Sequence, residues 1–278
     1  MDARSWLGLE ATHNPHRWFL PVAPGISTGH RALFGGCGLG AAIAALEGTA
    51  ERPVVWATAQ YLSFAKVGTT VDIDVTLAVH GRQTTQARAV AHVGGTEIIT
   101  VNAALGRRSF PEERHFPQAP VVQPPEQCPV RERYSAATDA LDSRLEQRWA
   151  LPLDADEPAP LAPGRVAVWT RMPELLEPSA ASFAVLGDYI PMGISFLHDG
   201  NAGSTSLDNT LRVMTPAPSD WYLLDISIDG VRNGFGHGVI HIWGQDGQLC
   251  AIGSQSCIVR RRESDTYEPP RRLADAPD

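Results

Sequence analysis

The chain has 278 residues, of which 43% are hydrophobic and 19% are charged, and its formal net charge is −8. This is the composition of a globular protein with one large or two ordinary domains, and the scattered Lys and Arg residues form no basic stripe, so we expect no nucleic-acid partner. Apolar stretches such as Leu39 to Leu46 are shorter than the ~20 residues that cross a bilayer, and the N-terminus lacks a signal-peptide layout, so we predict a cytoplasmic protein without membrane insertion.

The first part of the chain predicts one helix against an antiparallel sheet. The run from Phe34 to Glu47 begins with glycines and continues with apolar helix formers, and we expect Gly48 to end this buried helix. Apolar and polar residues then alternate from Thr70 to Val79, which is typical of a half-buried strand. Residues 83–93 and 97–105 predict two further strands.

Residues 107–165 interrupt this pattern with charges and many prolines, which predicts a linker across the surface. Within it, Ala136 to Trp149 is expected to form a short helix. The linker divides the chain into an N-terminal module (1–106) and a C-terminal module (166–265), followed by a tail (266–278).

The C-terminal module repeats the outline of the first. A helix is expected from about Pro178 to Tyr189, ended by Pro191. The strands expected after it run from Ser204 to Met214, Trp221 to Ile228, Gly238 to Trp243 and Gln248 to Val259. Both modules therefore read as a helix followed by a sheet.

Superposing the two modules shows where they differ. Aligning their hairpin turns places Gln255 on Ala103, and a second alignment places Ser206 on Ala57. Asp188 lies in a helix whose counterpart has no charged residue. Unpaired polar groups at core-facing positions cost about 1–3 kcal/mol, so polar residues confined to one copy predict a single functional site between the modules.

Several short motifs occur in a characteristic order. They are Leu33-Phe-Gly-Gly36 before a small-residue helix, Tyr61-Leu-Ser-Phe64, Asp188-Tyr-Ile-Pro191, Ser206-Leu-Asp208 and Ser254-Gln255. In this order and spacing the chain resembles the type II acyl-CoA thioesterases. The resemblance implies an α+β double-hotdog fold, in which two fused modules each wrap an antiparallel sheet around a central helix.

The resemblance also implies a site and an activity. Asp188, Ser206 and Gln255 would hold a water for attack on the thioester carbonyl. Asp208 is expected to support the site, because it should share a strand face with Ser206. Backbone N–H groups of Gly35, Gly36 and Cys37 would stabilise the oxyanion. Thr205 is adjacent to Ser206, so the source of the hydroxyl stays open by one residue. The implied substrate is an acyl-CoA, the implied role is in lipid metabolism, and no cofactor is expected.

Sheet edges in this fold are usually paired with another copy, which favours a homo-oligomer. A catalytically silent acyl-CoA-binding protein and an enoyl-CoA hydratase are alternatives on the same fold. The hydratase ranks last because its chemistry favours an Asp and His pair on one loop, and none is evident near Asp188.

Other motifs carry less weight. Gly25-Ile-Ser-Thr-Gly29 matches a nucleophile elbow but has too little chain before it for the sheet that an elbow requires. Gly36 to Ala41 fits a loose dinucleotide pattern without the βαβ context. His237 and His241 lie about 13 Å apart in a strand, too far for one ion, so we predict no metal. Four cysteines without a CxxC pair predict buried thiols.

Overall fold

The computed structural model describes residues 1–110, 112, 114–132, 138–172, 174 and 177–261. Its first half contains two helices, one 3₁₀ turn and six strands. They are α1 (Ala3–Leu7), β1 (Glu10–Ala11), β2 (Arg17–Pro21), η1 (Pro24–Ile26), α2 (Gly35–Ala50), β3 (Val54–Tyr61), β4 (Thr70–His80), β5 (Thr84–Val93) and β6 (Thr96–Gly106).

The second half repeats this plan with a divided helix. Its elements are η2 (Pro125–Gln127), η3 (Leu141–Arg144), β7 (Glu146–Trp149), β8 (Arg165–Arg171), α3 (Ala180–Leu186), α4 (Ile190–Leu197), β9 (Ala202–Ser206), β10 (Asp208–Val213), β11 (Tyr222–Arg232), β12 (Phe235–Gly244) and β13 (Leu249–Arg261).

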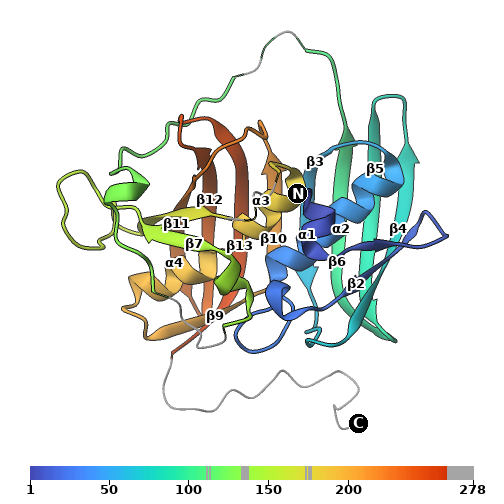
Figure 1. Cartoon of the computed structure of the whole chain (residues 1–278), viewed down its shortest axis with the longest axis horizontal. Coiled ribbons are helices and arrows are strands. Elements are labelled where there is room, and N and C mark those ends of the chain that lie inside the picture. Colours follow the sequence, from blue (N-terminus) through green and yellow to red (C-terminus); the bar gives the residue numbers. More distant parts are fainter. Residues whose placement is uncertain (111, 113, 133–137, 173, 175–176, 262–278) are drawn as a thin grey trace.

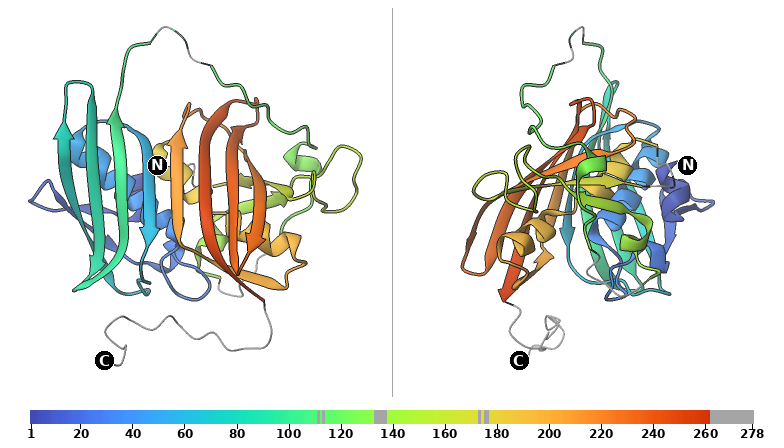
Figure 2. Two further views of the ribbon diagram at one scale, coloured as in Figure 1. Left: turned by 180° about the vertical axis from the view of Figure 1, so that it is seen from behind. Right: turned by 60° about the vertical axis from the view of Figure 1, so that its left-hand side comes forward.

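All strands belong to one antiparallel sheet, ordered β1-β2-β4-β5-β6-β3-β10-β13-β12-β11-β8-β7, with β9 paired to β13. The halves join where β3 pairs with β10 (Figure 2, left view). The helices lie on one side of this sheet (Figure 1). This is the expected α+β architecture of two helix-and-sheet modules.

Helix α2 contacts α3 closely because its glycines carry no side chain. A Cβ on Gly36 would lie 2.7 Å from the carbonyl oxygen of Ala184, and one on Gly40 would lie 2.8 Å from that of Ala181. Gly48 does not end this helix, contrary to expectation. It packs against Trp18, whose ring a Cβ would approach to 2.6 Å, and the helix continues to Ala50 before Glu51 takes a left-handed φ of 53°.

The expected single helix before Pro191 is in fact two helices. Helix α3 ends at Leu186, and Pro191 lies in the first turn of α4, where its missing N–H is tolerated. The segment Ala180–Leu197 is long and apolar enough to span a membrane by composition, but 83% of it is buried inside the protein, as in a core helix. The break between α3 and α4 contains Asp188.

The strand expected from Ser204 to Met214 is divided by a bulge. Ser206 on β9 pairs with Cys257, whereas Thr210 on β10 pairs with Ser254, so the β9–β10 side has one extra residue. The carboxylate of Asp208 accepts a hydrogen bond from the Ser256 N–H at 2.6 Å, which supports this irregular pairing.

The register of the sheet defines how the modules correspond. Thr58 pairs with Asn102, as Thr210 pairs with Ser254, and the Thr58 and Thr210 hydroxyls meet at 2.7 Å across the module boundary. Adding 152 to a residue number in the β3–β6 pair therefore gives its counterpart in the β10–β13 pair. This offset confirms Ala103 as the counterpart of Gln255.

The same offset makes Asn209, not Ser206, the counterpart of Ala57. The expected pairing of Ser206 with Ala57 is therefore wrong by three residues. It used a different offset from the one that aligns the hairpins.

The second half of the expected linker packs against the sheet. Within Ala136–Trp149, the described residues form η3 and strand β7 instead of the expected helix, because β7 pairs with the edge of β8. Cys128, Ala150 and Leu151 are buried against a cluster of tryptophans on β8, on β12 and beside β11. Residues 136 and 137 and the expected tail, 266–278, lie outside the described residues.

Candidate active site

The break between α3 and α4 presents Asp188 to both modules. Its side chain is buried, with 5% of the residue exposed. Oδ2 accepts a hydrogen bond from the Gly36 backbone N–H at 2.6 Å. Oδ1 accepts from Nε2 of Gln255 and, at 3.5 Å, from Nδ2 of Asn209. The carboxylate is thus held by donors on α2, β10 and β13.

This environment changes the acidity of Asp188. Burial raises its pKa from the ordinary 3.8 to about 7, although hydrogen bonds from Gln255, Gly36, Asn209 and Ser206 act in the opposite direction. A carboxylate with a pKa near neutrality can accept a proton from water and release it again. The position is therefore suited to general-base chemistry.

Gln255 connects Asp188 to the predicted hydroxyl. Its Nε2 atom donates to Oγ of Ser206 at 3.2 Å as well as to Asp188. Thr205 lies elsewhere, with its hydroxyl 3.2 Å from Nη1 of Arg260. The structure therefore brings Asp188, Ser206 and Gln255 together and leaves Thr205 outside the group.

Asp208 does not share a face with Ser206, contrary to expectation. Ser206 contacts Gln255 and Asn209 contacts Asp188, so both side chains lie on the site-facing side of the sheet. The bulge between them interrupts the alternation of side chains along the strand and directs Asp208 to the other face. Its contact with the Ser256 N–H supports the strand pairing. The expectation of a shared face is therefore wrong.

Asn209 is a site residue that sequence reasoning missed. It is 1% exposed and faces Asp188, whereas its counterpart Ala57 in the first module has no polar group. A single offset applied to both strand pairs would have found it, since that offset places Asn209 and Gln255 on Ala57 and Ala103.

The N-terminus of α2 supplies the other predicted residues. Gly35 lies beside Asp188, since a Cβ at this position would be 2.7 Å from Oδ2. The N–H of Gly36 is engaged by that carboxylate. Cys37 is fully buried, and burial together with the Asp188 charge raises the pKa of its thiol far above the ordinary value, so it stays protonated.

The other motifs acquire structural explanations. Ser27, in the elbow-like sequence, is buried beside η1 and donates its hydroxyl to the Pro24 carbonyl at 2.7 Å. In the described part of the chain, His, Cys, Asp and Glu form no group of three that could hold a metal ion.

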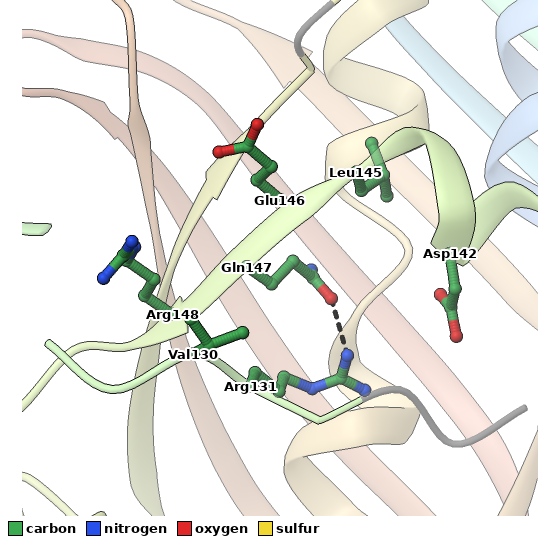
Figure 3. Close-up of a pocket in the computed structure, with 7 residues that line it drawn as sticks. All are labelled: Val130, Arg131, Asp142, Leu145, Glu146, Gln147 and Arg148. Carbon is green, nitrogen blue, oxygen red and sulfur yellow. Dashed lines mark hydrogen bonds between the residues drawn. The ribbon is translucent and has the colours of Figure 1, made fainter.

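A cavity of about 230 Å³ lies along β7, and Asp188 is not among its lining residues (Figure 3). Its lining residues are Val130, Arg131, Asp142, Leu145, Glu146, Gln147 and Arg148. Inside it, Arg131 donates to Oε1 of Gln147 at 2.6 Å, and Gln147 donates to Thr170 at 3.1 Å. The lining of this cavity includes none of the residues that contact Asp188.

The sequence matches two models of known domains. Residues 22–106 match the acyl-CoA thioesterase N-terminal domain, and residues 125–259 match the acyl-CoA thioesterase C-terminal domain. No curated protein matches the chain.

Solved structures agree with this assignment. A proposed thioesterase from Novosphingobium aromaticivorans is 30% identical, with a TM-score of 0.82 over 90% of this chain and 97% of that one. The acyl-CoA thioesterase II TesB2 of Mycobacterium marinum has the same fold at 20% identity, with a TM-score of 0.74 over 93% and 98%. The tesB protein of Mycobacterium avium subspecies paratuberculosis shares it at 18% identity, with a TM-score of 0.77 over 93% and 98%. The chain belongs to the acyl-CoA thioesterase family and has its double-hotdog fold.

Proposed function

We propose that the protein hydrolyses an acyl-CoA to the free acid and CoA by direct attack of a water that Asp188 activates. The observation that carries this proposal is the Asp188 carboxylate, which is buried, has a pKa of about 7 and is held by Gln255, Asn209 and the Gly36 N–H. A carboxyl with a pKa near 7 is partly ionised at neutral pH, which suits a general base that takes up and releases a proton in each turnover.

In the proposed reaction, the water oxygen bonds to the thioester carbonyl carbon while Asp188 takes one water proton. Gln255 and Ser206, which contact each other at 3.2 Å, orient the water. The tetrahedral intermediate then breaks its C–S bond, and the CoA sulfur receives the proton from Asp188. The carboxylate is thereby restored, and the products are the acid and the thiol.

The developing oxyanion would lie at the positive end of α2. The N–H groups of Gly35 and Cys37 and the helix dipole would stabilise it there. The Gly36 N–H would hold the base instead, because it already donates to Asp188. A role in lipid metabolism, a cytoplasmic location and a homo-oligomeric state accompany this proposal as predictions.

Thiol release from a panel of acyl-CoA esters, short to long and linear to aromatic, tests the proposed function. Hydrolysis of at least one ester would support it and define the acyl class. Tight binding of acyl-CoA without any thiol release would favour the silent binding protein instead.

A further inference from the structure

Three buried polar atoms near Asp188 have no hydrogen-bond partner among the described residues. They are the Tyr61 hydroxyl, Oδ1 of Asn209 and Oε1 of Gln255. Leaving one such group unpaired costs about 1–3 kcal/mol, and buried polar groups are nearly always paired in folded proteins. Unpaired groups gathered around one carboxylate therefore indicate atoms kept for a ligand.

Tyr61 reaches this group from the N-terminal module. In the β3–β10 register Asn209 lies opposite Ala59, and Tyr61 lies two residues beyond Ala59, on the same face of the sheet. Diagonal neighbours of this kind are within reach of an aromatic side chain, and the small Ala59 leaves space for the ring. The Tyr61 backbone is fixed by its N–H bond to the Leu207 carbonyl at 2.9 Å.

The Tyr61 ring also borders the start of α2. A Cβ on Gly35 would lie 3.1 Å from Cζ of Tyr61, the carbon that carries the hydroxyl, and 2.7 Å from Oδ2 of Asp188. The phenol and the carboxylate thus flank the same glycine. Any larger residue at this position would separate them.

The hydroxyl of Tyr61 is a neutral donor that makes no well-formed hydrogen bond among the described residues, and the side-chain amide of Asn209 lies beside it. Burial, followed by the Asp188 charge, raises the pKa of Tyr61 well above its ordinary 10.0, although the nearby Asn209 amide acts in the opposite direction, so the phenol keeps its proton throughout the neutral range. The Gly36 N–H, an expected oxyanion donor, is engaged by Asp188. One of the three expected backbone donors is therefore occupied, and the Tyr61 ring lies beside the same helix start.

We propose that Tyr61 is a catalytic residue whose hydroxyl donates a hydrogen bond to the thioester carbonyl oxygen and to the oxyanion that forms from it. The inference rests on the proposed hydrolase function. In this arrangement the C-terminal module supplies the general base, and the N-terminal module supplies one hydrogen-bond donor to the oxyanion. No proton leaves Tyr61 in this role, because it acts through its hydrogen bond alone.

Tyr61→Phe removes the hydroxyl and keeps the ring. Loss of one oxyanion donor lowers kcat by about 10²-fold in comparable sites, and we expect a fall of this size with the acid limb of the pH profile unchanged. Tyr222→Phe is the matched control, because the Tyr222 hydroxyl donates to the Ala217 carbonyl at 2.9 Å and lies outside this site. The control should retain wild-type kcat.

Two unreactive CoA analogues separate catalysis from structure. An alkyl thioether lacks the carbonyl, and a trifluoromethyl ketone forms a hydrate that mimics the tetrahedral intermediate. We expect Tyr61→Phe to weaken binding of the ketone about 10²-fold while leaving thioether binding unchanged. Equal weakening of both analogues, or full activity of Tyr61→Phe in an otherwise active enzyme, would overturn the inference. An inactive wild type would instead overturn the proposed function.

Discussion

The backbone N–H of Gly36 donates to Oδ2 of Asp188 at 2.6 Å, although the two residues lie 152 positions apart in the chain. This bond joins the start of α2 in one module to the break between α3 and α4 in the other. It fixes the proposed base at the contact between the modules, next to the positive end of a helix.

The pH dependence of the reaction should report Asp188. A general base must be ionised, and burial raises the pKa of this carboxyl to about 7, so kcat/KM should rise with pH and level off above about 7. The titratable neighbours Cys37, Tyr61, Tyr189 and Cys257 have pKa values raised by burial and stay neutral over this range. A pH–rate profile from pH 5 to 9 measures this acid limb, the range in which kcat/KM rises with pH. A profile that is flat down to pH 5 would contradict a base with this acidity.

Asn209→Ala should move that limb to higher pH. The amide stabilises the ionised carboxylate, since its Nδ2 lies 3.5 Å from Oδ1 of Asp188, and its loss favours the protonated form. The fold should tolerate the change, because Ala57 occupies the corresponding position in the first module. The same pH–rate profile, with thermal unfolding as a check on folding, decides the question. An unshifted limb would mean that Asn209 does not act on Asp188.

Asp188→Asn should stabilise the fold at alkaline pH while removing activity. The pKa of Asp188 is raised in the folded state, so its protonated form stabilises the fold relative to the unfolded chain. This contribution is fully present below about pH 3.8 and is lost as the pH rises through about 7. Asn carries no charge, and Gln255 and Asn209 have unpaired oxygens that can accept from its amide after rotation.

The gain in unfolding free energy of Asp188→Asn over wild type should therefore be larger at pH 8 than at pH 5. The expected difference is about 2–3 kcal/mol, because wild type loses about 1.4 kcal/mol for each pH unit between pH 5 and the folded-state pKa of about 7. Urea unfolding of both proteins at the two pH values measures it. An equal gain at pH 5 and pH 8 would refute a raised pKa.

Gly36→Ala should disrupt the contact between α2 and α3. The added Cβ would lie 2.7 Å from the Ala184 carbonyl oxygen and 2.9 Å from Cβ of Asp188, and backbone atoms cannot give way cheaply. We expect a loss of about 1–3 kcal/mol in the free energy of unfolding, as for overpacked cores. Gly95→Ala is the control, because nothing lies within 4 Å of its added Cβ. Equal stability of the two variants would contradict the close helix contact.

The sequence predicted the sheet better than the helices. Alternating residues such as Thr70 to Val79 determine both the element and its buried face, and β4 follows them to within one residue. Proline and glycine can each end a helix, but proline can also begin one and glycine can also allow close packing. The residues nearby in space decide between these roles, so the roles of Pro191 and Gly48 were misread from the sequence.

The grouping of side chains in the candidate site was predicted in part. Asp188, Ser206 and Gln255 are brought together as expected. The bulge before Asp208 has no local signature, so the face of Asp208 could not be deduced. Asn209 escaped notice, and Tyr61 was noted in a motif but given no role. The nearness of the two residues arises from a strand pairing between modules that only the folded register defines.

Thiol release by wild type and Asp188→Asn, measured on the acyl-CoA ester that wild type hydrolyses best, tests the central claim most directly. Binding of the thioether analogue to both proteins controls for folding and affinity. We expect Asp188→Asn to lose about 10²–10⁴-fold in kcat, as when a general base is removed, with analogue binding retained. A variant that keeps its kcat would contradict the assignment of Asp188 as the base.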